Sequence, residues 1–481
     1  MEQDIKSKFF SGLSWAFIQN ILLKGLGMVF SIILARILSP EDFGLIGMLT
    51  VFISLSQVFI ESGITEALIQ KPDCSDRDYS TAFFFNIVVS LVVYVLLFIG
   101  APLISAFYHT PELCLLTKIL CINVVLGSLV IVQRAKMTRA MEFRPLTFIS
   151  LTSLIVSSVV GLVMAYHGWG VWALVVQTLL FTCVSIIMFP FFSRWFPKFL
   201  FDKESFKKLW NYGSKLIVTG VLNVVILNLS AILVGRYYRS RQVGFYTRAQ
   251  SLAEVPAGLL TTVLSSVSFP MFCKIQDDRD YQLKVYKRIL FNSVLLVGPI
   301  AVLLTLLARP LVLVLLTEKW LPCVTIMQFL LLGRMLMPIG ATNTNLLRSV
   351  GNTSLYMKLY FIEAPLTILG IIIAVPFGVE AMAFSTLLVA LIMFFISSQI
   401  IGGMFGYGLL KMIIDWKMIL LSLLLMAIGL YGILYVISNE YLQLIVGGLF
   451  GAAIYLICCK YFHLLDDEIV EQIRKRMPKF I

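Results

Sequence analysis

Long apolar runs, separated by short polar breaks, recur along the whole chain. A helix that crosses a hydrocarbon layer of roughly 30 Å needs about 20 apolar residues. The pattern therefore predicts about fourteen membrane-spanning helices joined by short loops. We expect these spans at residues 10–35, 43–69, 80–107, 113–133, 146–167, 169–192, 209–235, 248–273, 288–308, 322–347, 355–376, 379–401, 413–437 and 442–463.

The composition supports the same interpretation. Of the 481 residues, 59% are hydrophobic and 13% are charged, whereas soluble domains contain about 45–50% apolar and about 25% charged residues. A soluble enzyme, a disordered protein and a secreted disulfide scaffold are therefore excluded. The chain is predicted to be an all-α integral membrane protein.

The net charge of +12 would suggest a nucleic-acid ligand in a soluble protein. In a membrane protein, an excess of Lys and Arg is typical of cytoplasmic loops. With both termini in the cytoplasm, 27 of the 38 Lys and Arg residues lie on the cytoplasmic side, seven lie on the opposite side and four lie inside spans. This bias predicts that both termini are cytoplasmic and removes the argument for a nucleic-acid partner.

The cysteine and histidine patterns predict no metal site and no cofactor. The eight cysteines and three histidines show no CxxC or Cys/His ligand spacing. We therefore interpret the cysteines as small core or lipid-facing residues.

An internal repeat divides the chain. Residues 35–45 and 235–245 share a small residue followed by Arg and, later, an apolar-Gly-apolar element, at an offset of 200. The element Asp-Arg-Asp-Tyr at 76–79 recurs at 278–281, and the Phe-Asn pair that opens span three recurs at the start of span nine. The order and spacing predict two parallel halves of six spans each.

The repeat gives four expected segments. They are a first lobe at 1–192, a cytoplasmic linker at 193–208, a second lobe at 209–401, and two appended spans with a cytoplasmic tail at 402–481. Within the basic stretch 193–212 and just beyond it, apolar residues from Phe206 to Gly213 fall on one helical face. This favours a helix lying on the inner membrane surface over a charged loop.

The sequence Leu-Ala-Arg-Ile-Leu-Ser-Pro-Glu-Asp-Phe-Gly at 34–44, with Gln19-Asn20 in span one and the basic loop 133–139, resembles Wzx-type polysaccharide transporters. These flippases belong to the multidrug/oligosaccharidyl-lipid/polysaccharide exporter superfamily. The resemblance implies two six-helix lobes in a V (a MATE-like fold) around a central cavity, plus two C-terminal helices. It also implies a bacterial inner-membrane flippase that moves undecaprenyl-diphosphate-linked oligosaccharides to the outer leaflet by alternating access. The implied pathway is surface polysaccharide assembly, with a polysaccharide polymerase or export machinery as further partners.

Charged residues inside spans are the candidate chemistry, because each costs about 2.5–3.5 kcal/mol at mid-span and usually faces a cavity or a partner. We expect Lys24 and Arg334 to face a cavity. Lys215 either faces the cavity or extends its ammonium group to the membrane interface, and the two alternatives are equal. An anionic diphosphate needs cations to replace its water. The expected substrate-binding residues are Lys24, Lys215, Arg334, Gln19, Asn20, Asn223, Asn345 and Arg348.

Three carboxylates, Glu61, Glu254 and Glu363, are candidates for coupling transport to H+ or Na+. The alternative is that they pair with the cavity cations and hold the lobes closed. Four arginines near the predicted outer mouth either receive the diphosphate or belong to a solvated loop; they are Arg236, Arg239, Arg241 and Arg248.

Two other functions compete with a flippase. A MATE-like cation-coupled multidrug antiporter would need an acidic first bundle, but span one carries Lys24 and no acid. A membrane glycan polymerase or ligase would need an acid/base or metal-binding carboxylate set, for which the two Asp-Arg-Asp elements are the candidates. Their duplication and flanking Lys and Arg favour a structural role, so transport is the expected function.

Overall fold

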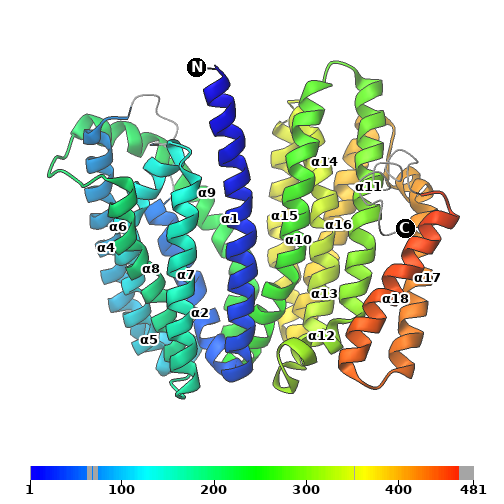
Figure 1. The fold of residues 1–481 in the computed structure, drawn as a ribbon, viewed down its shortest axis with the longest axis horizontal. Coiled ribbons are helices and arrows are strands. Elements are labelled where there is room, and N and C mark those ends of the chain that lie inside the picture. The colour runs from blue at the N-terminus through cyan, green and yellow to red at the C-terminus, as the bar shows by residue number, and fades with distance from the viewer. Residues whose placement is uncertain (1, 62–67, 69–73, 352, 465–481) are drawn as a thin grey trace. The chain divides into compact units, whose positions relative to one another are not determined.

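The structure is a computed structural model that describes residues 2–61, 68, 74–351 and 353–464, and these residues form α-helices, short 3-10 helices and connecting turns (Figure 1). Packing divides the chain into a first unit, Met1–Thr247, and a second unit, Arg248–Ile481. Each unit is described by itself.

The first unit is a helical bundle. Its helices are α1 (Glu2–Ile37), α2 (Pro40–Glu61), α4 (Asp76–Tyr108), α5 (Glu112–Leu120), α6 (Ile122–Arg139), α7 (Phe143–Tyr166), α8 (Val171–Ser193), α9 (Lys203–Tyr237) and the start of α10 (Ser240–Lys274).

The second unit is also helical. It contains the rest of α10, α11 (Arg279–Leu306), α12 (Ala308–Leu315), η1 (Glu318–Trp320), α13 (Cys323–Met335), α14 (Met337–Ser349), α15 (Thr353–Ala374), η2 (Val375–Phe377), α16 (Val379–Phe405), α17 (Leu409–Val436) and α18 (Glu440–Tyr461).

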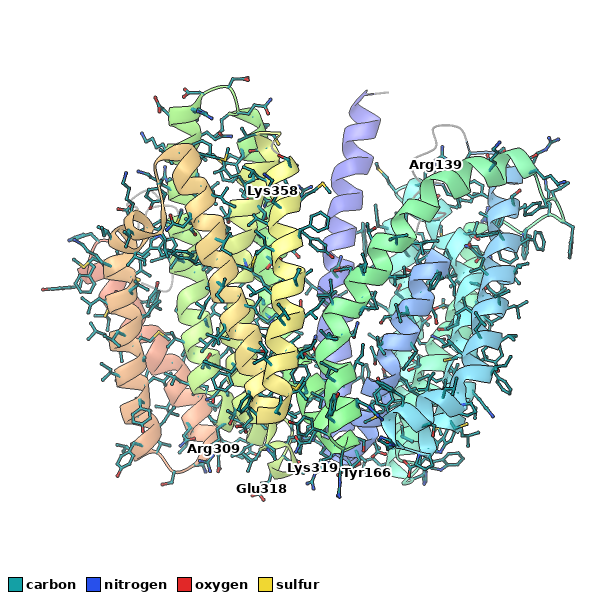
Figure 2. All side chains as sticks on the ribbon, turned by 180° about the vertical axis from the view of Figure 1, so that it is seen from behind. Arg139, Tyr166, Arg309, Glu318, Lys319 and Lys358 are labelled. Carbon is teal, nitrogen blue, oxygen red and sulfur yellow. The ribbon has the colours of Figure 1, made fainter. Side chains whose placement is uncertain are left out.

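The predicted number of spans is confirmed. Within the described residues, fourteen helical segments are long and apolar enough to cross a membrane. In the first unit, Arg139 and Tyr166 lie at opposite ends of the bundle (Figure 2). In the second unit, Lys358 lies at the end opposite Arg309 and Lys319 (Figure 2). The chain is a multi-pass helical membrane protein.

Two predicted spans each consist of two helices rather than one. The span expected at 113–133 breaks at Cys121, between α5 and α6, and the span expected at 322–347 breaks at Leu336, between α13 and α14. Pro338 explains the second break, because its ring excludes the carbonyl four residues earlier and it has no N–H to donate. We find no comparable cause at Cys121.

The linker region is partly helical. Helix α9 begins at Lys203 and continues without a break into span seven. Most side chains on which the predicted apolar face depends, including Phe206 and Trp210, lie outside the described side chains. Helix α9 packs on α2 and α4 and belongs to the first unit, so packing groups span seven with the first six. The lobe boundaries that the repeat implies stay a prediction.

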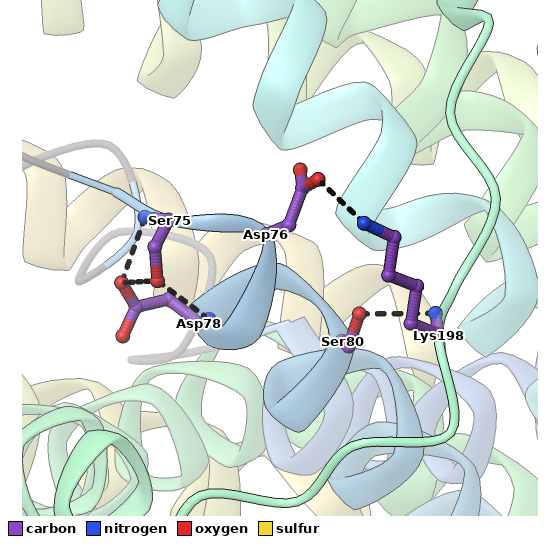
Figure 3. Close-up of polar contacts among 5 residues, drawn as sticks. All are labelled: Ser75, Asp76, Asp78, Ser80 and Lys198. Carbon is purple, nitrogen blue, oxygen red and sulfur yellow. Dashed lines mark hydrogen bonds and ion pairs between the residues drawn. The ribbon is translucent and has the colours of Figure 1, made fainter.

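The loop before α9 is fixed to the start of α4 (Figure 3). The backbone N–H of Lys198 donates to the Ser80 hydroxyl at 3.1 Å, and the Lys198 ammonium lies 3.5 Å from the Asp76 carboxylate. Trp195 is 5% exposed and packs with Tyr79 and Phe83. This loop therefore covers the first turns of α4.

Pairs of polar side chains join the helices inside the bundles. In the first unit, Ser90 of α4 bonds to Ser128 of α6 at 3.1 Å. Ser185 of α8 bonds to Ser153 of α7 at 2.9 Å. All four side chains are buried. Small hydroxyl residues allow close helix approach, and each such bond satisfies two groups that hydrocarbon would leave unpaired.

The repeated 35–45 and 235–245 segments meet in the first unit. A Cβ on Gly44 would overlap the Ser240 carbonyl oxygen, and a Cβ on Gly244 would overlap the Pro40 carbonyl oxygen. Pro40 and Ser240, like Gly44 and Gly244, are 200 residues apart. The contact of Gly44 with Ser240 and the contact of Gly244 with Pro40 are therefore equivalent under the repeat. The backbones of α2 and α10 therefore touch where both repeats carry glycine, because no other residue leaves room.

We predict that Gly44→Ala and Gly244→Ala destabilise the protein by about 1–3 kcal/mol or more, since the added methyl meets rigid backbone. The thermal midpoint of the purified protein in detergent measures the effect. Gly100→Ala in α4 is the matched control, because a Cβ there meets nothing within 4 Å. Equal midpoints for all three variants would contradict this close approach.

Candidate functional site

An ion pair between two spans lies in the second unit. The Arg334 guanidinium of α13 lies 2.6 Å from the Glu254 carboxylate of α10. The Arg334 side chain is 17% exposed and the Glu254 side chain is 47% exposed. Arg334 occupies the last turn of α13, where the negative end of the helix dipole favours a cation.

This pair joins residues for which the sequence suggested separate roles. Arg334 was expected to bind substrate and Glu254 to couple an ion, with mutual pairing as the alternative. The structure brings the two together within one unit. The arginine side chain is mostly enclosed, whereas about half of the Glu254 side chain is exposed.

A second polar cluster lies deeper in the same unit. The Tyr286 hydroxyl donates to the Asn343 Oδ1 at 2.8 Å, and the Asn343 Nδ2 donates to the Ser397 hydroxyl at 3.0 Å. Asn345, an expected sugar ligand, is 5% exposed and donates to Ser268 at 2.9 Å. These bonds tie α14 to α10, α11 and α16.

The other expected residues of the second unit lie at the surface. The Arg348 guanidinium lies 4.9 Å from the centre of the Phe269 ring. Arg348 is exposed, and so is Glu363 on α15. Neither residue joins the Arg334–Glu254 pair.

In the first unit, the expected ligands lie on two helices. Lys24 and Asn20 are exposed on α1, and Gln19 beside them is partly buried. Asn223 is exposed on α9, and the Lys215 side chain lies outside the described side chains. Lys24 is therefore accessible at the surface of this unit.

A polar cavity of about 410 Å³ lies within the first unit, between α2, α6, α7 and α8. Glu61 and Arg134 line it together with Gln57, Gln177 and Asn123. The Asn123 Oδ1 is buried and accepts no hydrogen bond from the described residues. An unsatisfied acceptor beside a carboxylate is typical of a site for water or a small polar ligand.

Sequence reasoning identified only one wall of this cavity. Glu61 on span two was a candidate, whereas the polar residues that α6 and α8 contribute were not. On α8, Gln177, Thr178, Thr182 and Ser185 line the cavity at helical spacing, and this pattern is a signal that the sequence carries. The cavity gives Glu61 the polar surroundings that a coupling carboxylate needs, and its coupling role stays a prediction.

Three of the four outer arginines contact protein groups. Arg241 lies 3.3 Å from the Glu41 carboxylate. The Arg236 guanidinium donates to the Phe107 carbonyl. Arg248 is 5% exposed, and its guanidinium lies 5.9 Å from the Trp320 ring centre. These contacts favour a structural role for the three.

Aspartates of the two Asp-Arg-Asp elements cap helices. Ser75 and Asp78 form a reciprocal capping box at the start of α4 (Figure 3). In the second repeat, the Asp278 carboxylate accepts from the Tyr281 N–H at the start of α11. Such bonds satisfy the free N–H groups of a first turn. In the described parts of the chain, no cluster of three or more His, Cys, Asp or Glu side chains could hold a metal.

The fold is shared with two solved membrane transporters. The structure of the lipid II flippase MurJ in an inward closed conformation superposes with a TM-score of 0.74, at 20% identity, over 94% of this chain and 99% of that chain. An inward-facing multidrug resistance MATE family transporter of the multidrug/oligosaccharidyl-lipid/polysaccharide exporter superfamily gives a TM-score of 0.58, at 14% identity, over 82% and 98%.

The chain belongs to the family described as polysaccharide biosynthesis protein, which matches residues 33–325. Lipopolysaccharide biosynthesis protein WzxC of Escherichia coli (strain K12) is 26% identical over 77% of this chain and 75% of its own length. Succinoglycan biosynthesis transport protein ExoT of Rhizobium meliloti (strain 1021) is 24% identical over 70% and 69%. The expected resemblance to Wzx-type polysaccharide biosynthesis and transport proteins is confirmed.

A double-mutant cycle tests the ion pair. Glu254→Gln and Arg334→Gln should each destabilise the protein, by less than the roughly 3–5 kcal/mol typical of fully buried pairs, because Glu254 is half exposed. The double variant should recover part of that loss, since it strands no charge. Midpoints of chemical unfolding in detergent measure the coupling. Strictly additive effects would show that the two side chains do not interact.

Filling the polar cavity tests whether the predicted coupling role of Glu61 requires the open space beside its side chain. Gly127 lines the cavity, and a Cβ there meets nothing within 4 Å. We expect Gly127→Leu to change stability by only about 0.5 kcal/mol and to lower transport, because it displaces the water that reaches Glu61. Gly100→Leu, which also points into open space, is the control. Normal transport by Gly127→Leu would separate the cavity from the transport cycle.

Proposed function

We propose that the protein is a flippase for lipid-linked oligosaccharides. It moves an undecaprenyl-diphosphate-linked glycan repeat unit from the cytoplasmic to the outer leaflet for surface polysaccharide assembly. The observation that carries the proposal is a cation held inside a span by an exchangeable partner, Arg334 with Glu254, in a chain of a polysaccharide biosynthesis family.

The relatives support the class of cargo. WzxC is a lipopolysaccharide biosynthesis protein and ExoT is a succinoglycan biosynthesis transport protein, while MurJ is a lipid II flippase. All three act in pathways of polysaccharide or lipid-linked sugar. The chain's cations supply what a diphosphate needs on leaving water, namely charge-assisted hydrogen bonds.

The proposed cycle uses the unequal accessibility of the ion pair. An arriving diphosphate competes with the Glu254 carboxylate for Arg334, and Lys24 of the first unit is a separate candidate for contact with the cargo. Protonation of Glu254, or binding of Na+, would free Arg334 for the cargo, and loss of the ion would restore the pair and release the cargo. Glu61 and Glu363 are the further coupling candidates.

The proposed setting is the bacterial inner membrane with both termini in the cytoplasm, as the distribution of Lys and Arg favours. The partners would be the lipid-linked oligosaccharide, the bilayer and a polymerase or export machinery for the finished polysaccharide. The MATE-like fold alone also suits a drug antiporter. The family match and the cations in the spans favour the flippase.

Complementation of a strain that lacks its polysaccharide flippase tests the proposal. Wild-type protein should restore surface polysaccharide, and Lys24→Ala and Arg334→Ala should each lower the rate about tenfold or more, since one charged hydrogen bond is worth roughly 1.5–3 kcal/mol. Lys118→Ala is the matched control, because the Lys118 ammonium lies over the Phe98 ring at 4.9 Å.

Two outcomes would count against the proposal. Full activity of the Lys24→Ala/Arg334→Ala double variant, at normal expression, would remove these residues from the transport path. Drug extrusion without polysaccharide rescue would favour the antiporter.

A further inference from the structure

A basic pocket in the second unit is lined by residues of the first turns of α11 and α17 and by Leu464 after α18. Its volume is about 570 Å³, within the roughly 300–1,000 Å³ of ligand-binding pockets. The polar side chains that line it are Lys284, Lys287, Arg288, Asn292, Tyr407 and Asp415. The pocket is separate from the Arg334–Glu254 pair.

The lining carries more positive than negative charge. Three cations face one carboxylate, Asp415, which already accepts a hydrogen bond from the Tyr407 hydroxyl at 2.7 Å. The Lys287 ammonium lies 4.5 Å from the centre of the Tyr407 ring. Burial, together with the hydrogen bond and the negative charge of Asp415, raises the pKa of Tyr407, so the phenol keeps donating. The described lining therefore offers the ammonium groups of Lys284 and Lys287 to an anion.

The repeat does not require these cations. At the offset of 202 set by the Asp-Arg-Asp-Tyr elements, the counterparts of Lys284, Lys287 and Arg288 are Ala82, Phe85 and Asn86. At the offset of 206 set by the Phe-Asn pairs, they are Asp78, Thr81 and Ala82. The first half carries no cation at the three positions in either alignment. The loop that contains Trp195 packs over the first turns of α4 instead. The cations are a feature of the second half alone, beside the two appended spans.

The three cations of the pocket lie where span nine is predicted to begin, at residue 288. Lys284 lies about 8 Å and Arg288 about 14 Å from the start of α11. Lysine and arginine at a predicted span boundary are placed to meet the headgroups of anionic lipids. Phe291 and Leu464 add apolar surface to the lining.

We propose that this pocket binds the phosphate-bearing headgroup of an anionic membrane lipid. Lys284 and Lys287 contact the phosphate oxygens, and Phe291 and Leu464 contact the first carbons of the lipid chains. The same chemistry is offered by a phospholipid and by a polyprenyl diphosphate. The proposal does not depend on transport, because binding is measured in the absence of turnover.

Native mass spectrometry of the purified full-length protein, titrated with phosphatidylglycerol, cardiolipin, phosphatidylcholine or undecaprenyl diphosphate, tests the site. We expect the anionic lipids to bind more tightly than phosphatidylcholine. Lys284→Gln/Lys287→Gln should weaken anionic-lipid binding about 30-fold, given the usual contribution of each Lys near an anionic headgroup. Lys284→Arg/Lys287→Arg should retain binding, and Lys358→Gln, at an exposed position of α15, should stay near the wild-type value.

The comparison of lipids identifies the source of the phosphate. Tighter binding of phosphatidylglycerol or cardiolipin assigns the site to phospholipid, and tighter binding of undecaprenyl diphosphate assigns it to the polyprenyl carrier. Equal affinities in all variants, no preference for anionic lipid, or equal binding of inorganic phosphate alone would overturn the proposal. Should the double variant elute as aggregate in gel filtration, Lys284→Gln alone, with about a fivefold expected loss, takes its place.

Discussion

Polar groups that enter hydrocarbon must find partners within the protein, and this constraint governs the interior of both units. An unpaired polar group in an apolar medium costs several kcal/mol. Hydrogen bonds between helices meet this need, as between Ser90 and Ser128 in the first unit and between Tyr286 and Asn343 in the second. They also specify which helices pack together, which apolar side chains alone would not do. The Arg334–Glu254 pair meets the same constraint with full charges, and its proposed role in binding an anion builds on this structural contact.

The two repeats keep the same backbone plan and use it differently. Gly44 and Gly244 are equivalent in sequence and in contact, because the crossing of α2 and α10 leaves no room for a side chain. The helix caps are less strictly repeated, with Ser75 as the N-cap of α4 and Asp278 as that of α11. The duplication thus fixes where helices begin and cross, while the chemistry of each half has diverged.

The sequence predicts the spans well because hydrophobic length is a property of each segment alone. It also predicts that the Asp-Arg-Asp elements are structural, since caps depend on neighbouring residues. It does not predict the break at Cys121, which no local residue explains. Nor does it separate two expected substrate-binding residues, the buried Asn345 that is bonded to Ser268 and the exposed Arg348, because that distinction depends on which helix packs alongside.

The proposed transport of an anion places a physical demand on its cationic site. A cation that is permanently neutralised would not attract a diphosphate, and one that is never neutralised would make the empty carrier costly to fold in hydrocarbon. Arg334 meets both requirements through a partner that is half exposed, so water, a proton or an anion reaches Glu254 before it reaches the arginine. A fully buried pair would be more rigid and would exchange more slowly. The unequal exposure of the two side chains is therefore the property that a reversible anion site in a membrane requires.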